Sequence, residues 1–132
     1  MERVIRALDT NILVRVLAEP DSAQYALARA AMQTPFTVPV SVMLETEWVL
    51  RSVFRWRRDQ IADAMLTLLE LPECHAGSSL LRWVIARFAD GADFADMVHL
   101  VLADAADRFV TFDKDLVRKA GLDAPIKIET LS

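Results

Sequence analysis

The stretch GADFADMVHLVLADAADRFVTFDKDL, residues 91–116, changes its pattern of apolar residues partway along. Residues 94–106 carry apolar side chains at helical spacing, which predicts a helix. The next segment, RFVTFD at residues 108–113, is rich in residues that favour strands. A short helix is expected at residues 115–120, because Gly121 follows it and glycine often ends a helix. A strand placed between helices is typical of a parallel sheet that helices cover.

The rest of the chain also alternates short extended segments with longer helical ones. Residues 11–17 are ambiguous, because this apolar run either extends the strand before it or begins a helix. Ser41 is expected to cap the helix after the second strand. The predicted strands lie at residues 4–8, 35–41, 73–76 and 126–131, and the other predicted helices at 22–32, 42–56, 57–71 and 78–90, the last with a serine cap.

This order of elements predicts an α/β fold, a three-layer sandwich with a central, mostly parallel sheet between helices. A chain of 132 residues suits one domain, so residues 1–132 are expected to form a single unit. Ligands of such sheets bind beyond the carboxyl ends of the strands. Polar residues at those ends are therefore the candidates for function.

Composition narrows the class of protein further. Hydrophobic residues make up 54% of the chain and charged residues 26%, which indicates an ordered globular protein. The net charge of −4 argues against a simple basic nucleic-acid binder, although acids gathered around a cation are compatible with a phosphodiester substrate. The single Cys74 cannot form an internal disulfide, and no apolar run approaches the roughly 18 residues of a membrane span. A cytoplasmic protein without membrane contact is expected.

Two aspartates close predicted strands. Asp9 ends the first strand, and Asp113 ends the strand at residues 108–113. Both are expected at the edge of the sheet where sites form. The alternative is that each simply initiates a turn by accepting a hydrogen bond from nearby backbone.

The predicted helix at residues 42–56 carries two glutamates. At 100° per residue, Glu45 shares its sector with Val42 and Val49, so it is expected on an apolar face. A carboxylate in such a place needs a cation or hydrogen bonds to compensate the loss of water. Glu47 is expected to be an ordinary surface charge.

Asp93 and Asp96 lie at the start of the helix at residues 94–106. Asp93 has an alternative role as the helix cap, and an aspartate stripe opposite an apolar stripe is usually a solvated face. His99 is expected at the surface or partly buried, rather than as a metal ligand. Taken with the acids of the other segments, however, these side chains supply several hard oxygen ligands, which suit one or two Mg²⁺ or Mn²⁺ ions rather than zinc.

Four segments in order resemble the PIN-domain nucleases, and most closely the VapC-like toxins of bacterial toxin–antitoxin pairs. They are ALDTNILVRVL at residues 7–17, VPVSVMLETEWVLRS at 38–52, DGADFADMVHLVLA at 90–103 and VTFDKDL at 110–116. The resemblance covers nearly the whole chain. It implies a parallel sheet between helices and metal-dependent cleavage of RNA.

The resemblance also assigns roles to residues. It implies catalytic and metal-binding roles for Asp9, Glu45, Asp96 and Asp113, with Asp93 as a further metal ligand, and these five form what we call the acidic set. Polar neighbours are expected to orient the acids or water, namely Thr10, Asn11, Thr111 and Asp115. Basic candidates for the RNA backbone are Arg51, Arg55, Lys114 and Arg118. The implied partners are RNA, a cognate antitoxin and a second copy of the chain in a homodimer.

Other classes of protein fit less well. A phosphoacceptor receiver domain would have an acidic pair after its first strand, where this chain has Asp9 alone. A phosphatase of the haloacid-dehalogenase type would have a second aspartate at the position of Asn11. A PIN-fold nuclease with an RNA-processing role other than that of a toxin remains an alternative. So does an interaction module that has kept the fold and lost the chemistry.

Overall fold

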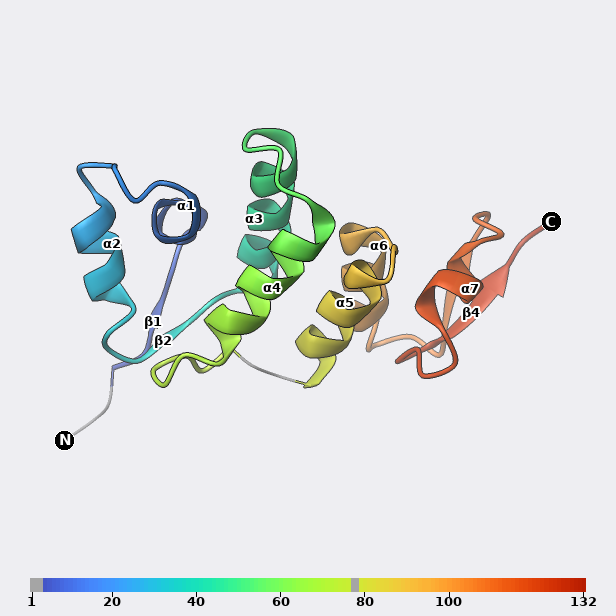
Figure 1. Ribbon diagram of the computed structural model, residues 1–132. Coiled ribbons are helices and arrows are strands. Elements are labelled where there is room, and N and C mark those ends of the chain that lie inside the picture. The colour runs from blue at the N-terminus through green and yellow to red at the C-terminus, as the bar shows by residue number, and fades with distance from the viewer. Residues whose placement is uncertain (1–3, 77–78) are drawn as a thin grey trace. The chain divides into compact units, whose positions relative to one another are not determined.

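The structure, a computed structural model, describes residues 4–76 and 79–132 of the chain (Figure 1). The chain forms two compact units, Met1–Gly77 and Ser78–Ser132, which we call the N-terminal unit and the C-terminal unit. Each is described by itself below. Both combine helices with a pair of parallel strands.

The N-terminal unit places two short parallel strands beside four helices. The register of the strands pairs Arg6 with Phe36 and Ala7 with Thr37. Cys74 makes a single parallel bridge to the other side of Phe36, where a longer strand was expected. The elements are β1 (Arg6–Ala7), α1 (Thr10–Ala18), α2 (Tyr25–Ala31), β2 (Phe36–Thr37), α3 (Val40–Ser52) and α4 (Arg58–Leu69).

The core of the N-terminal unit forms where the apolar faces of the helices meet β2. Phe36 is completely buried, and apolar side chains of α1, α3 and α4 are buried at helical spacing. Burial of such side chains supplies the main driving force for folding. The largest of them are Leu13, Met43, Leu50, Ile61 and Met65.

The C-terminal unit also contains one pair of parallel strands. Their register runs from Arg108 opposite Lys127 to Thr111 opposite Thr130. The rings of Phe88 and Phe94 pack edge to face, with centroids 5.4 Å apart, in the core of this unit. The elements are α5 (Ser79–Ala89), α6 (Phe94–Leu102), β3 (Arg108–Thr111), α7 (Leu116–Ala120) and β4 (Lys127–Thr130).

Helix α7 is short and ends in a tight turn. Gly121 ends it with a φ of +84°, a conformation that glycine adopts without strain. A Cβ atom at this position would also lie 2.6 Å from Nη1 of Arg87, on α5. Just beyond the turn, Nε1 of Trp83 donates a hydrogen bond to Oδ1 of Asp123 over 3.1 Å. This hydrogen bond ties the turn after α7 to α5.

The predicted α/β class, with parallel strands and flanking helices, is confirmed. The ambiguous run at residues 11–17 is helical, because Asp9 caps a helix that begins at Thr10. The expected cap at Ser41 is wrong, since α3 begins at Val40 and Pro39 precedes it with no side-chain cap. The serine cap expected before α5 would fall on Ser78, outside the described residues.

The strands are shorter than the sequence pattern predicts. The single domain over residues 1–132 stays a prediction.

In the part of the chain that the structure describes, no helix is both long and apolar enough to cross a membrane.

Candidate active site

Asp9 lies at the end of the first strand and begins α1. Its extended backbone, with φ −82° and ψ 162°, places Oδ1 2.8 Å from the backbone N–H of Thr10, which donates to it. This is the turn-initiating role that the sequence left open as an alternative. The other oxygen, Oδ2, makes no hydrogen bond or ion pair with the described residues, and the side chain is exposed. One carboxylate oxygen of Asp9 therefore accepts a hydrogen bond at the start of α1, and the other remains available to a ligand.

Glu45 is joined to Asp9 through the residue between them in space, Thr10. The hydroxyl of Thr10, which is buried, donates a short hydrogen bond to Oε1 of Glu45. Because Thr10 contacts both carboxylates, one through its N–H and the other through its hydroxyl, the start of α1 is fixed against α3. The N-terminal unit thus brings two of the predicted acids together.

The expected positions of the two glutamates on α3 are wrong and must be exchanged. Glu47, not Glu45, is on the buried face, with 3% of its surface exposed. That face also holds Met43, Thr46 and Leu50. Glu45 is exposed, and Val42 and Val49, which share its sector, are only partly buried. Nε of Arg51 donates to Oε2 of Glu47 over 2.7 Å and compensates its charge.

In the C-terminal unit, Asp93 and Asp96 share the first turn of α6. Asp93 is the helix cap, and its Oδ2 accepts a hydrogen bond from the N–H of Asp96 over 3.0 Å. The pKa of Asp96 is raised, first because the carboxyl is partly buried, and then by the negative charges of Asp93 and Asp113. His99 opposes this rise. The three aspartates therefore lie close enough to repel one another.

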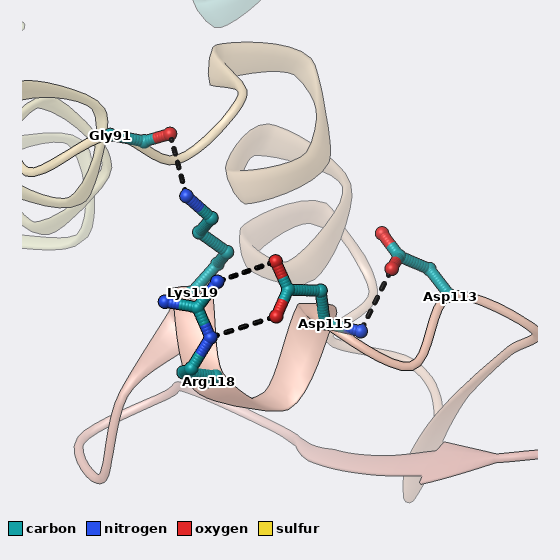
Figure 2. A network of polar contacts seen from close by, with 5 residues as sticks. All are labelled: Gly91, Asp113, Asp115, Arg118 and Lys119. Atoms are coloured by element: carbon teal, nitrogen blue, oxygen red, sulfur yellow. Dashed lines mark hydrogen bonds and ion pairs between the residues drawn. The ribbon is translucent and has the colours of Figure 1, made fainter.

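Asp113 follows β3 and is hydrogen-bonded to residues on both sides of it in the sequence. Its N–H donates to the hydroxyl of Thr111 over 3.0 Å, and its Oδ1 accepts from the N–H of Asp115 over 2.9 Å. Figure 2 shows one oxygen of Asp113 turned toward that N–H and the other turned away from it. As with Asp9 and Asp93, one carboxylate oxygen is held by a backbone N–H and the other has no partner among the described residues.

Asp115 differs from the other acids because an arginine occupies both of its oxygens. Arg118 donates from Nε to Oδ1 over 2.8 Å and from Nη2 to Oδ2 over 2.6 Å (Figure 2). This two-fold pairing lowers the pKa of Asp115 and raises that of Arg118. Asp115 therefore has little capacity left as a metal ligand, and much of the charge of Arg118 is already neutralised.

The polar neighbour Asn11 and the basic candidates for RNA binding differ in exposure and in their contacts. Asn11 is exposed on α1 and lines a cavity together with Asp9. Arg55 and Lys114 are exposed, and Arg55 has a φ of +59° in the turn after α3. Arg51 is engaged by Glu47. Sequence reasoning missed the buried role of Glu47, because α3 carries apolar residues on more than one stripe.

The arrangement supplies hard oxygen atoms, which are the ligands that Mg²⁺ and Mn²⁺ prefer. One unit presents Asp9 and Glu45, and the other presents Asp93, Asp96 and Asp113. In neither unit do the described residues bring three or more His, Cys, Asp or Glu side chains close enough to hold one metal ion. A role in metal binding thus remains a prediction for each acid, and the donor chemistry fits such an ion.

Comparison with known proteins gives one result that covers most of the chain. Residues 6–122 match the family model described as PIN domain. Neither a curated protein nor a solved structure matches the chain. The matched range includes every member of the acidic set.

Proposed function

Since this chain belongs to the PIN-domain family, we propose that it is a metal-dependent endoribonuclease that hydrolyses phosphodiester bonds of RNA. Proteins of this family are generally nucleases, and they typically use divalent metal ions. The acidic set would hold one or two Mg²⁺ or Mn²⁺ ions. When bound, such an ion stabilises charge on a phosphodiester and makes a water molecule more acidic.

The observation that carries the proposal is the way in which three aspartates use only one of their two carboxylate oxygens. Asp9, Asp93 and Asp113 each commit one oxygen to a backbone N–H and keep the other without a partner in the described part of the chain. An oxygen fixed in this way orients the second oxygen before any cation arrives, which lowers the entropy lost on binding. The raised pKa of Asp96 supports the same reading, because crowded carboxylates favour a cation.

The chain's own polar residues have distinct roles in this proposal. Thr10 orients Asp9 and Glu45 together, through its N–H and its hydroxyl. Thr111 accepts from the N–H of Asp113 and fixes the turn after β3. In the hydrolysis, the water oxygen forms a bond to phosphorus, the bond from phosphorus to the leaving oxygen breaks with its electron pair on that oxygen, and the protons are exchanged with solvent.

Binding of the RNA backbone would fall to basic side chains outside this set. Arg55 and Lys114 are exposed, and the structure shows them in no hydrogen bond or ion pair with the described residues. They are the better candidates, since Arg51 and Arg118 are already paired with carboxylates. Each phosphate contact adds affinity that falls with rising salt concentration.

The biological role proposed from the sequence resemblance is that of a toxin in a toxin–antitoxin pair. In this role the chain would act on RNA in the cytoplasm as a homodimer, and a cognate antitoxin would restrain it. Expression of the wild-type chain in a bacterial host should then stop growth, while Asp9→Asn should not. Normal growth with an active ribonuclease would favour a role in RNA processing instead.

A cleavage assay tests the enzymatic proposal directly. The purified chain is incubated with mixed RNA in Mn²⁺ or in EDTA, beside Asp9→Asn and a matched control, Asp63→Asn. Asp63 is exposed on α4 and lies outside the acidic set. In Mn²⁺, the wild type and the control are expected to cleave RNA, and Asp9→Asn is not. In EDTA, no cleavage is expected. Cleavage that persists in EDTA or in Asp9→Asn would exclude the metal-dependent reaction, and RNA binding without any cleavage would favour the inactive module.

Metal binding can be measured without the reaction. Calorimetric titration with Mn²⁺ should show weaker binding for both Asp9→Asn and Asp96→Asn than for Asp63→Asn. A loss in both variants supports a metal-binding role for each of the two acids. A loss in only one of them would contradict the proposed metal-binding role of the other acid.

A further inference from the structure

A cavity of about 340 Å³ lies between α1 and α2 of the N-terminal unit, and Asp9 forms part of its wall. Figure 1 shows these two helices as neighbours. A volume of this size falls within the range of roughly 300–1,000 Å³ that is usual for small-ligand pockets. The cavity opens beside one of the acids proposed to act on RNA.

The polar side chains of the cavity are held in place by one another. Nε of Arg15 donates to Oε1 of Gln24 over 3.1 Å, and Nη1 of Arg15 donates to Oε1 of Glu19 over 2.5 Å. The carbonyl end of the Gln24 amide is therefore already used as an acceptor. The groups that remain for a ligand are N–H donors, namely the amide nitrogen of Gln24 and Nη2 of Arg15.

Apolar side chains complete the lining. Leu27 on α2 is 75% exposed, which is unusual for a large apolar residue, and Ile12 on α1 is partly exposed. Both line the cavity. Flat nucleobases pack on apolar side chains while their edges form hydrogen bonds, so this combination of surfaces fits a base.

We propose that this cavity binds a guanine base of the RNA, in a nucleotide close to the bond that is cut. The proposal rests on the proposed function in taking RNA as the ligand and in placing the cut bond near Asp9, but the preference for guanine does not depend on cleavage. Guanine presents two adjacent acceptors, O6 and N7, to a pair of donors, whereas adenine presents a donor in place of O6. The set of donors from Arg15 and Gln24 therefore favours guanine over adenine. The side chain of Gln24 determines this specificity.

Nucleotide titration followed by NMR tests the proposal without any cleavage. The labelled chain, in EDTA, is titrated separately with the 5′-monophosphates of guanosine, adenosine, cytidine and uridine. Guanosine monophosphate is expected to shift the amide signals of Gln24 and Leu27, with an affinity about tenfold higher than that of adenosine monophosphate. Gln24→Ala should remove the preference. Gln33→Ala, an exposed glutamine that lines a different cavity, should keep it.

The nucleotide titration and the RNA cleavage assay together separate failure of this inference from failure of the proposed function. If the chain cuts RNA but all four nucleotides bind equally, or none shifts these signals at millimolar concentration, the guanine site is excluded and the ribonuclease stands. If guanosine monophosphate is preferred but no RNA is cut, the site stands and the ribonuclease is excluded. A preference that Gln24→Ala leaves intact also overturns the proposal, and so does occupation of the cavity by a protein segment that nucleotides cannot displace.

Discussion

The ammonium group of Lys119 donates a hydrogen bond to the carbonyl oxygen of Gly91, 3.4 Å away (Figure 2). Gly91 stands just before Asp93, and Lys119 is on α7, which follows Asp113. The contact therefore joins the two segments that carry the acids of the C-terminal unit. Gly91 itself has a φ of +115°, so the turn depends on a glycine as well as on this hydrogen bond.

Replacing Lys119 by Met should weaken this connection while it keeps most of the side chain's length. A hydrogen bond of this kind contributes about 0.5–1.5 kcal/mol to stability, and we expect the free energy of unfolding to fall by about that amount. Urea denaturation measures it. The control is Lys127→Met, because the side chain of Lys127 is exposed on β4 and makes no hydrogen bond or ion pair with the described residues. An equal loss in the two variants would contradict a specific role for Lys119.

The ion pair of Glu47 and Arg51 should respond unequally to the loss of either partner. Glu47 is nearly fully buried, whereas 49% of the Arg51 side chain is exposed. Arg51→Met leaves a buried carboxylate without its cation, which is expected to cost about 3 kcal/mol. Glu47→Gln leaves an arginine that can turn toward water, so its cost should be nearer 1 kcal/mol. Thermal unfolding of both variants measures the difference, and a larger effect of Glu47→Gln would contradict this assignment.

The same pair bears on how Arg51 is tested as an RNA ligand. Loss of activity in an Arg51 variant is expected from the damaged fold alone, so it does not establish a contact with RNA. Arg55→Ala is the better probe, because that side chain is exposed and makes no ion pair with the described residues. It should weaken RNA binding most at low salt.

Much of the order of helices and strands could be predicted from local pattern because it depends on local chemistry, although residues 11–17 were ambiguous and residues 73–76 form only a bridge. Asp9 and Asp93 cap helices, and Gly121 ends one, as residues of these types do in isolation. Strand length could not be predicted in the same way. A strand forms only where a neighbouring strand completes its hydrogen bonds. The sequence of residues 73–76 alone does not indicate that only Cys74 pairs with Phe36.

The sequence predicts which residues form the candidate site, and their metal-binding roles stay a prediction, but it does not predict the contacts of these side chains. The hydrogen bond between Thr10 and Glu45 joins residues far apart in the sequence, and it depends on how α1 packs on α3. The choice between Glu45 and Glu47 failed for a related reason. The buried face of α3 is set by its tertiary neighbours, and the valine stripe chosen from periodicity is not the one that packs.

Asp96 gives a prediction about pH. Its pKa in the folded chain is raised above the ordinary value of 3.8, so the folded state holds this proton more tightly than the unfolded state does. Stability from this group therefore falls as pH rises through the interval between the two pKa values, and the ionised carboxylate destabilises the fold above it. In EDTA at neutral pH, Asp96→Asn should melt at a higher temperature than the wild type.

Two further measurements make this prediction specific. At a pH below 3.8 the advantage of Asp96→Asn should disappear, because the wild-type carboxyl is then protonated as well. Addition of Mg²⁺ at neutral pH should raise the melting temperature of the wild type more than that of the variant. A variant that is less stable than the wild type in EDTA at neutral pH would contradict the direction of the pKa shift.

Thr10 allows a test with a closely matched control. Thr10→Val removes the hydroxyl that donates to Glu45 and keeps the shape of the side chain. If Thr10 orients this acid for a metal ion, its loss should lower Mn²⁺ affinity or RNA cleavage by about 10–100-fold, as for other groups that support metal ligands. Thr46→Val makes the same change at a buried threonine whose hydroxyl donates to the carbonyl of Val42, within its own helix. It should lose stability to a similar degree without the loss of activity, and Thr10→Ser should restore most of the wild-type rate. Equal losses of activity at the two positions would mean that Thr10 acts only through the stability of the fold.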